Sequence, residues 1–150
     1  MDLAIRVARS LPDSASLVAQ ALGRTAHVVC ASPAYVQRFG SPGQPQDLAA
    51  HACVTYALST APHTWSFDGP RGTQQVDVGG RLALGNSLAV REVVLAGAGI
   101  ALLPAFYVSE EVRQGRLLAL LRGFSPKPAT VYAVYPRAKF GSAKVRAFVD

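Results

Sequence analysis

The sequence predicts an α/β fold, because short apolar strands and capped helices alternate along its second half. After a turn at residues 85–87, the pattern indicates a helix over 88–96, a strand over 100–103 and a helix over 105–114. The chain has 150 residues and half of them are hydrophobic, so it can bury a core of ordinary domain size. This composition excludes disordered and fibrous proteins.

Strands dominate the expected structure near the N-terminus. Residues 3–7 and 27–31 are short apolar runs, which are typical of buried strands. Between them, the cluster at 11–14 predicts a turn, and 16–22 is compatible with either a strand or a helix. The sequence therefore leaves one element of this region open.

A helix is expected after the second strand. Ser32 can cap it, Pro33 suits its first position, and Gly40 suits a stop after 34–39. Two prolines and a glycine predict a loop over 41–47. Four further strands are expected, at 52–58, 63–68, 74–78 and 81–84.

Caps and helix breakers define the remaining elements. Asn86 or Ser87 can begin the helix over 88–96, and Gly97 can end it. Pro104 opens the next helix. The last expected elements are strands at 117–121 and 131–135 and a helix from Ser142 to Asp150.

The charge is concentrated toward the C-terminus. The formal net charge is +6, and eight of the 15 basic residues lie in 112–150, where Asp150 is the only acidic residue. A basic end can bind phosphate or nucleic acid, but these residues are spread out and few aromatic residues alternate with them. A solvated face or a subunit contact is the favoured interpretation.

No membrane span or secretory leader is expected. The longest apolar run, 93–103, is about half of the ~20 residues that a span needs. Residues 1–6 lack a basic head followed by an apolar stretch, and two cysteines are too few for a disulfide scaffold. We therefore expect a cytoplasmic domain with reduced thiols.

Three patterns resemble catalytic or cofactor sites but lack required parts. The Gly-x-Gly at 97–99 follows a helix and enters a strand, which is the reverse of a dinucleotide-binding loop. Ser87 lies between a strand and a helix, as in a hydrolase nucleophile elbow, but all three histidines precede it. Cys30 and Cys53 lack the usual zinc spacing to the histidines. We expect no catalytic residue, no metal ligand and no cofactor.

Two expected helix N-termini follow apolar strands, and either could bind an anion. They lie at Ser32-Pro33 and Asn86-Ser87. Both would line one cleft if their strands ended at the same sheet edge. Ordinary capping is the alternative for both. Arg6 could add a positive charge to such a cleft, or it could form a surface salt bridge.

Several segments, in order, resemble the effector-binding domain of LysR-type transcriptional regulators. The most specific is Ala96–Pro104, which reads AGAGIALLP. The other matching segments are Asp2–Arg6, Leu11–Ser14, Leu22–Arg24, Val29–Tyr35, Asp47-Leu48 with His51, Trp65–Phe67, Gly115–Leu117, Tyr132–Pro136 and Ser142–Asp150. Their order and spacing carry the resemblance.

The resemblance implies a fold like that of type 2 periplasmic binding proteins. Lobe two would be nearly complete at 24–120, and remnants of lobe one would lie at 1–15 and 128–150. A small-molecule effector, often an organic anion, would bind between the lobes. The effector contacts implied by position are Arg6, Ser32, Pro33, Asn86, Ser87 and Pro104.

The same resemblance implies the function of a sensor in transcription regulation. DNA would be contacted through an N-terminal region missing from this sequence, and the full-length parent would form a homo-oligomer. The alternative is an exported solute-binding protein of the same fold. A signal peptide encoded upstream would favour that alternative, and a helix-turn-helix would favour the regulator.

Overall fold

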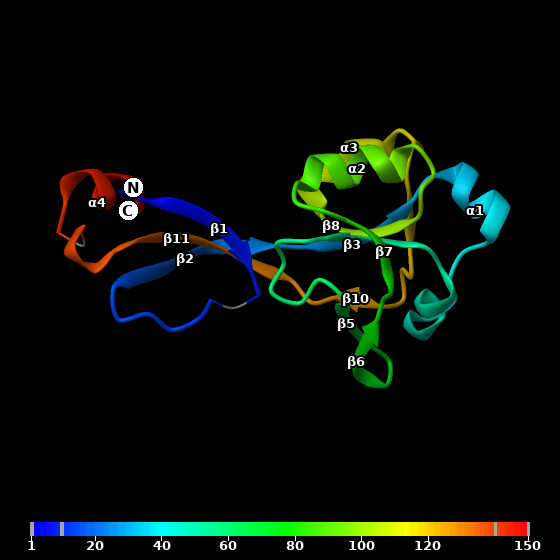
Figure 1. Cartoon of the computed structure of the whole chain (residues 1–150), viewed down its shortest axis with the longest axis horizontal. Helices are drawn as coiled ribbons and strands as arrows, with labels where there is room; N and C mark the ends of the chain where they lie inside the picture. Colours follow the sequence, from blue (N-terminus) through cyan, green and yellow to red (C-terminus); the bar gives the residue numbers. More distant parts are fainter. Residues whose placement is uncertain (1, 10, 140, 150) are drawn as a thin grey trace. The chain divides into compact units, whose positions relative to one another are not determined.

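The computed structural model describes residues 2–9, 11–139 and 141–149 (Figure 1). The chain divides into two compact units. Unit 1 comprises Met1–Thr25 and Pro128–Asp150, and unit 2 comprises Ala26–Lys127. Residues 24–120, the expected lobe two, therefore fall almost entirely in unit 2. The identification of the units with the two lobes stays a prediction.

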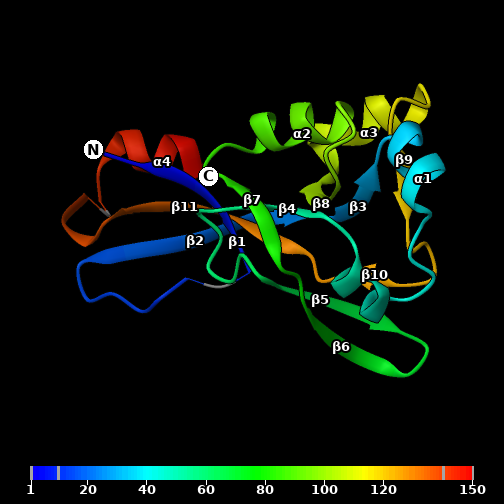
Figure 2. The ribbon, with the colours of Figure 1, turned by 45° about the vertical axis from the view of Figure 1, so that its right-hand side comes forward.

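Unit 1 contains an antiparallel sheet with the strand order β1-β11-β2 (Figure 2). Its strands are β1 (Ala4–Ala8), β2 (Leu17–Thr25) and β11 (Ala129–Pro136). The undecided segment at 16–22 is therefore a strand from Leu17 onward. A short 3₁₀ helix, η2 (Arg137–Lys139), and α4 (Ala143–Val149) follow β11. The Ser142 hydroxyl accepts a hydrogen bond from the Val145 amide at 3.2 Å, as expected of a cap. Asp150, the expected end of this helix, lies outside the described residues.

A five-stranded mixed sheet forms the centre of unit 2, with the order β7-β4-β8-β3-β9. The strands are β3 (His27–Ala31), β4 (Cys53–Tyr56), β7 (Gly80–Leu84), β8 (Ile100–Pro104) and β9 (Leu118–Leu120). β4 pairs in parallel with β7 and β8, whereas β3 pairs antiparallel with β8 and β9. The strands of this sheet therefore run in two directions.

Each face of the unit 2 sheet is covered by a different set of elements (Figure 1). On one face lie α2 (Ser87–Leu95) and α3 (Ala105–Arg113), packed over Cys30 and Val54. On the other lie α1 (Pro33–Phe39), the 3₁₀ helix η1 (Pro45–Ala50), the hairpin of β5 (Thr64–Gly69) and β6 (Gly72–Asp77), and β10 (Ser125–Pro126). Val29 and Cys53 belong to this second core. Successive strand residues point to opposite faces, so the near-continuous apolar strands supply both cores.

Two local expectations differ from the structure. The expected loop at 41–47 leads into η1, whose N-terminus is closed by Gln44 and Asp47. Asp47 Oδ2 accepts hydrogen bonds from the Gly43 and Gln44 amides at 2.9 and 3.1 Å. The prolines that suggested a loop are compatible with this helix, because Pro45 occupies its first position, where no N–H is needed. The short strand β10 was not expected, because two residues carry no periodic pattern.

Candidate functional site

Three of the expected effector contacts lie at one end of the unit 2 sheet. Pro104 ends β8 and is paired in register with His27, at the start of β3. Asn86 and Ser87 follow β7, which runs in the same direction as β4 and β8. We call this end, defined by Asn86, Ser87 and Pro104, the β7/β8 end.

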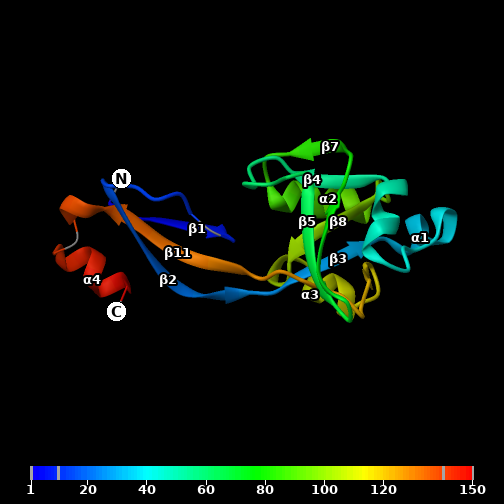
Figure 3. The same ribbon diagram turned by 90° about the horizontal axis from the view of Figure 1, so that it is seen from below.

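Ser32 and Pro33 lie at the opposite end of the same sheet. They follow β3, which is antiparallel to β8, as the opposed arrows in Figure 3 show. A side chain on Gly97, just beyond the end of α2, would come within 3.6 Å of Ser32 Oγ. The nine residues of α2 span about 13 Å from that point to Asn86. The two helix N-termini therefore do not lie at one sheet edge, so the condition for a cleft lined by both is not met.

The N-terminus of α1 is capped by Ser32. Ser32 is buried, and its hydroxyl accepts a hydrogen bond from the Tyr35 amide at 3.1 Å. The Val36 amide donates to the Ser32 carbonyl at 3.2 Å, and Pro33 has no N–H to offer. This geometry is that of an ordinary cap.

The N-terminus of α2 is capped by Asn86, whose carbonyl also accepts a hydrogen bond from the Val90 amide at 3.0 Å. Asn86 Oδ1 accepts hydrogen bonds from the Leu88 and Ala89 amides at 2.8 and 3.4 Å. Ser87 is half-buried, and its hydroxyl has no hydrogen bond within the part of the chain that the structure describes. This hydroxyl is therefore available to an anion beside the positive end of the helix dipole.

Arg6 lies on β1 in unit 1, exposed and opposite Tyr132 in register. Arg6 belongs to unit 1, whereas the β7/β8 end belongs to unit 2. Its role as an effector contact stays a prediction.

The two cysteines lie on opposite faces of the unit 2 sheet. Cys30 on β3 belongs to the core under α2 and α3, and Cys53 on β4 belongs to the other core, with β8 between the two strands. Burial raises the pKa of Cys30 to about 12 and that of Cys53 to about 11. They are therefore structural thiols rather than a metal-binding or redox pair.

We expect both thiols to resist alkylation in the folded chain. At pH 8 about one in a thousand or fewer would be ionised, and the thiolate is the reactive form. Iodoacetamide labelling followed by mass spectrometry should give little modification of native protein and rapid modification in urea. Rapid labelling of either cysteine without urea would contradict the buried placement.

Unit 2 also has a surface pocket of about 580 Å³, which no sequence motif indicated. Its walls come from the segment before and within η1, from the β5–β6 turn and β6, and from Phe124. Because these segments are far apart along the chain, no local motif could have indicated the pocket.

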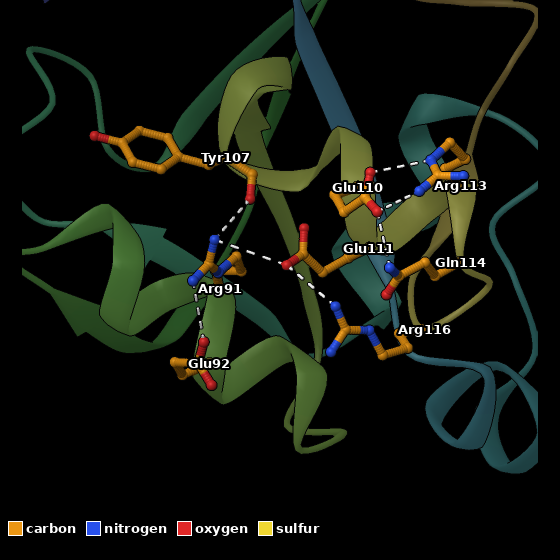
Figure 4. Close-up of polar contacts among 8 residues, drawn as sticks. All are labelled: Arg91, Glu92, Tyr107, Glu110, Glu111, Arg113, Gln114 and Arg116. Atoms are coloured by element: carbon orange, nitrogen blue, oxygen red, sulfur yellow. Dashed lines mark hydrogen bonds and ion pairs between the residues drawn. The ribbon is translucent and has the colours of Figure 1, made fainter.

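A polar cluster joins α2 to α3 (Figure 4). Arg91 Nη1 donates to the Tyr107 carbonyl at 3.1 Å and lies 3.8 Å from Glu111 Oε1. Arg116 Nη2 lies 3.6 Å from the same carboxylate oxygen. The cluster ties together the two helices that begin at the β7/β8 end.

Comparison with known proteins gives the family. The LysR substrate binding domain matches residues 1–150. The chain is 37% identical over 150 residues to the HTH-type transcriptional regulator PtxR of Pseudomonas aeruginosa, a match covering all of this chain and 47% of the relative. It is 31% identical over 151 residues to the HTH-type transcriptional activator AaeR of Escherichia coli, covering 100% and 48%. The chain thus spans about half the length of these curated relatives.

Solved structures agree with this assignment. The regulatory domain of CrgA, a LysR-type transcriptional regulator from Neisseria meningitidis, superposes with a TM-score of 0.81 at 28% identity, covering 99% of this chain and 72% of that one. The full-length Vibrio cholerae virulence activator AphB superposes with a TM-score of 0.77 at 27% identity, covering 99% and 50%.

The solved structures also give the fold class. LysR regulatory domains have a fold like that of type 2 periplasmic binding proteins, so the predicted fold class is confirmed. Within the described ranges, no helix is long and apolar enough to cross a membrane. The relatives are named as regulators of transcription rather than as enzymes. The chain belongs to the LysR substrate-binding domain family of transcriptional regulators.

Proposed function

We propose that this chain senses a small organic anion as the effector-binding segment of a cytoplasmic LysR-type regulator. The family match over the whole chain supports this function. The names of the relatives favour a regulator over a solute-binding protein. In this proposal, a helix-turn-helix region outside the present sequence contacts DNA, and the complete regulator acts as a homo-oligomer.

The observation that carries the ligand proposal is the chemistry of the β7/β8 end. The N-terminus of α2 places a partial positive charge there, and the Ser87 hydroxyl is unengaged among the described residues. Pro104 ends the parallel strand two places along the sheet. Carboxylates suit such a position, since the hydroxyl can donate to them beside the positive end of the helix dipole. Arg6 is proposed to add a positive charge from unit 1.

Two serines at helix N-termini provide a matched pair of variants to test the ligand site. A thermal-shift screen of the chain with acetate, benzoate, salicylate and citrate selects the carboxylate used for titration. Ser87→Ala should lower the affinity for that carboxylate about tenfold, because it removes one hydrogen bond to a charged group. Ser32→Ala should leave the affinity unchanged but lower the free energy of unfolding by about 1 kcal/mol, since it removes a buried cap.

Comparing the two serine variants shows whether an affinity loss comes from the effector site or from the loss of any helix cap. An affinity unchanged in Ser87→Ala, or lost equally in Ser32→Ala, would place the effector elsewhere. Arg6→Gln tests the expected contribution of unit 1. It should lower the affinity for the same carboxylate, because it removes the positive charge.

A further inference from the structure

The pocket beside η1 is distinct from the proposed effector residues. It measures about 580 Å³, within the usual range for small-molecule sites, and is open to solvent. Gln44, Gln46, Asp47, Arg71, Gln74 and Phe124 are among its lining residues, and none of the expected effector contacts is. We call it the η1 pocket.

Hydrogen bonds and close packing fix the walls of the η1 pocket. Gln46 Nε2 donates to Gln74 Oε1 at 2.6 Å, which ties η1 to β6. The side chain of Asp47 holds the two amides that precede η1. The Phe124 ring lies so close to Gly69 that a β-carbon there would be 2.7 Å from it. These contacts hold the walls of the pocket in place.

Two opposite charges line the η1 pocket without pairing with each other. Arg71 is exposed, and its guanidinium has no ion pair or hydrogen bond among residues 2–9, 11–139 and 141–149. Asp47 uses Oδ2 for the Gly43 and Gln44 amides, which leaves Oδ1 available. A ligand carrying both charges would satisfy both side chains.

The two glutamines add one donor group and one acceptor. Because Gln46 donates through Nε2 and Gln74 accepts through Oε1, the free groups are the Gln46 carbonyl and the Gln74 amino group. The first can accept from an ammonium, and the second can donate to a carboxylate. The Phe124 ring supplies an apolar surface.

We propose that the η1 pocket binds a free α-amino acid with an apolar side chain. Arg71 and Gln74 receive the α-carboxylate, Asp47 and Gln46 receive the α-ammonium, and Phe124 contacts the side chain. A dicarboxylate is disfavoured because Asp47 repels the second negative charge. A polyamine is disfavoured because Arg71 repels it.

The test is an NMR titration of the ¹⁵N-labelled 150-residue chain with L-leucine. We expect a Kd of about 1 mM, given the few atoms of the ligand and the open pocket, and amide shifts centred on Gly43, Gln44, Arg71 and Gln74. N-acetyl-L-leucine, which lacks the ammonium, and L-leucinamide, which lacks the carboxylate, should each bind at least tenfold more weakly. Equal binding of either analogue would overturn the zwitterion assignment.

Two exposed arginines give a matched control. Arg71→Gln should lower the affinity for L-leucine at least tenfold. Arg122→Gln should leave that affinity unchanged, because Arg122 is exposed but does not line the pocket. Ser87→Ala should bind L-leucine normally, which separates this site from the proposed effector site. Retained binding in Arg71→Gln, lost binding in Ser87→Ala, or the absence of any shift with the wild-type chain would each overturn the proposal.

Discussion

Replacing Gly99 with alanine is expected to lower the free energy of unfolding of unit 2 by about 3 kcal/mol or more. A β-carbon at this position would lie 2.4 Å from the Ala52 carbonyl oxygen and 3.0 Å from its carbon. Both atoms belong to the backbone, so no side-chain rotation can relieve the overlap. The Ile100 amide also donates to this carbonyl at 2.8 Å, which holds the two segments together.

The position of Gly99 in the sheet explains the size of this effect. Just beyond it, Ile100 pairs with Cys53 as β8 joins β4 near the middle of the five-stranded sheet. Moving the strands apart would disturb both cores, to which Cys53 and Val54 belong. Urea unfolding followed by circular dichroism would measure the loss of stability. An insoluble or unfolded Gly99→Ala variant would also agree with the prediction.

Two other glycines calibrate the measurement. Gly85→Ala should change stability by less than about 0.5 kcal/mol, because a β-carbon there would meet nothing within 4 Å. Gly97→Ala should cost about 1–2 kcal/mol, since its φ of +90° strains any L side chain. A wild-type urea midpoint for Gly99→Ala would show that the two backbones can separate freely. The Gly-x-Gly of the AGAGIALLP segment thus has a structural reason that needs no dinucleotide.

Local rules predicted most elements of unit 2 to within a few residues. Ser32, Pro33 and Gly40 mark α1 because capping, a fixed φ and a left-handed stop are properties of single residues and their immediate neighbours. The same reasoning located α2 after Asn86. The open choice at 16–22 was settled by pairing with β11, more than 100 residues away, which no local pattern reports.

The candidate site could be predicted only in part, because it depends on strand direction. Ser32 and Ser87 look alike in sequence, since each lies between an apolar strand and a helix. Their separation follows from the antiparallel pairing of β3 with β8, which the apolar pattern of either strand does not specify. The η1 pocket could not be predicted for a similar reason, because it is formed by three segments that are distant in the sequence.

Arg91→Ala is expected to lower the free energy of unfolding by about 2 kcal/mol. Arg91 is the residue of α2 that donates to the Tyr107 carbonyl of α3 and approaches the Glu111 carboxylate (Figure 4). The side chain of Glu111 is only 12% exposed, so its charge needs compensation. Without Arg91 that compensation falls to Arg116, whose side chain is 55% exposed.

The expected cost lies below the roughly 3–5 kcal/mol of a fully buried ion pair, for two reasons. Arg116 remains beside Glu111. In addition, Arg91 Nε is buried and has no hydrogen-bond partner among the described residues, so the wild-type arginine already carries a desolvation cost. Arg91→Lys keeps the positive charge and should restore part of the stability.

Variants at two other positions separate this contact from ordinary surface charge. Arg113→Ala removes an arginine that is 72% exposed and paired with Glu110 on the same helix, so it should cost less than about 0.5 kcal/mol. In a Glu111→Gln background, Arg91→Ala should cost clearly less than in the wild type, because the carboxylate that it compensates is gone. Equal costs in the two backgrounds would assign the stabilisation to the packing of the arginine stem and its bond to Tyr107. The charge of Glu111 would then contribute nothing to the junction of α2 and α3.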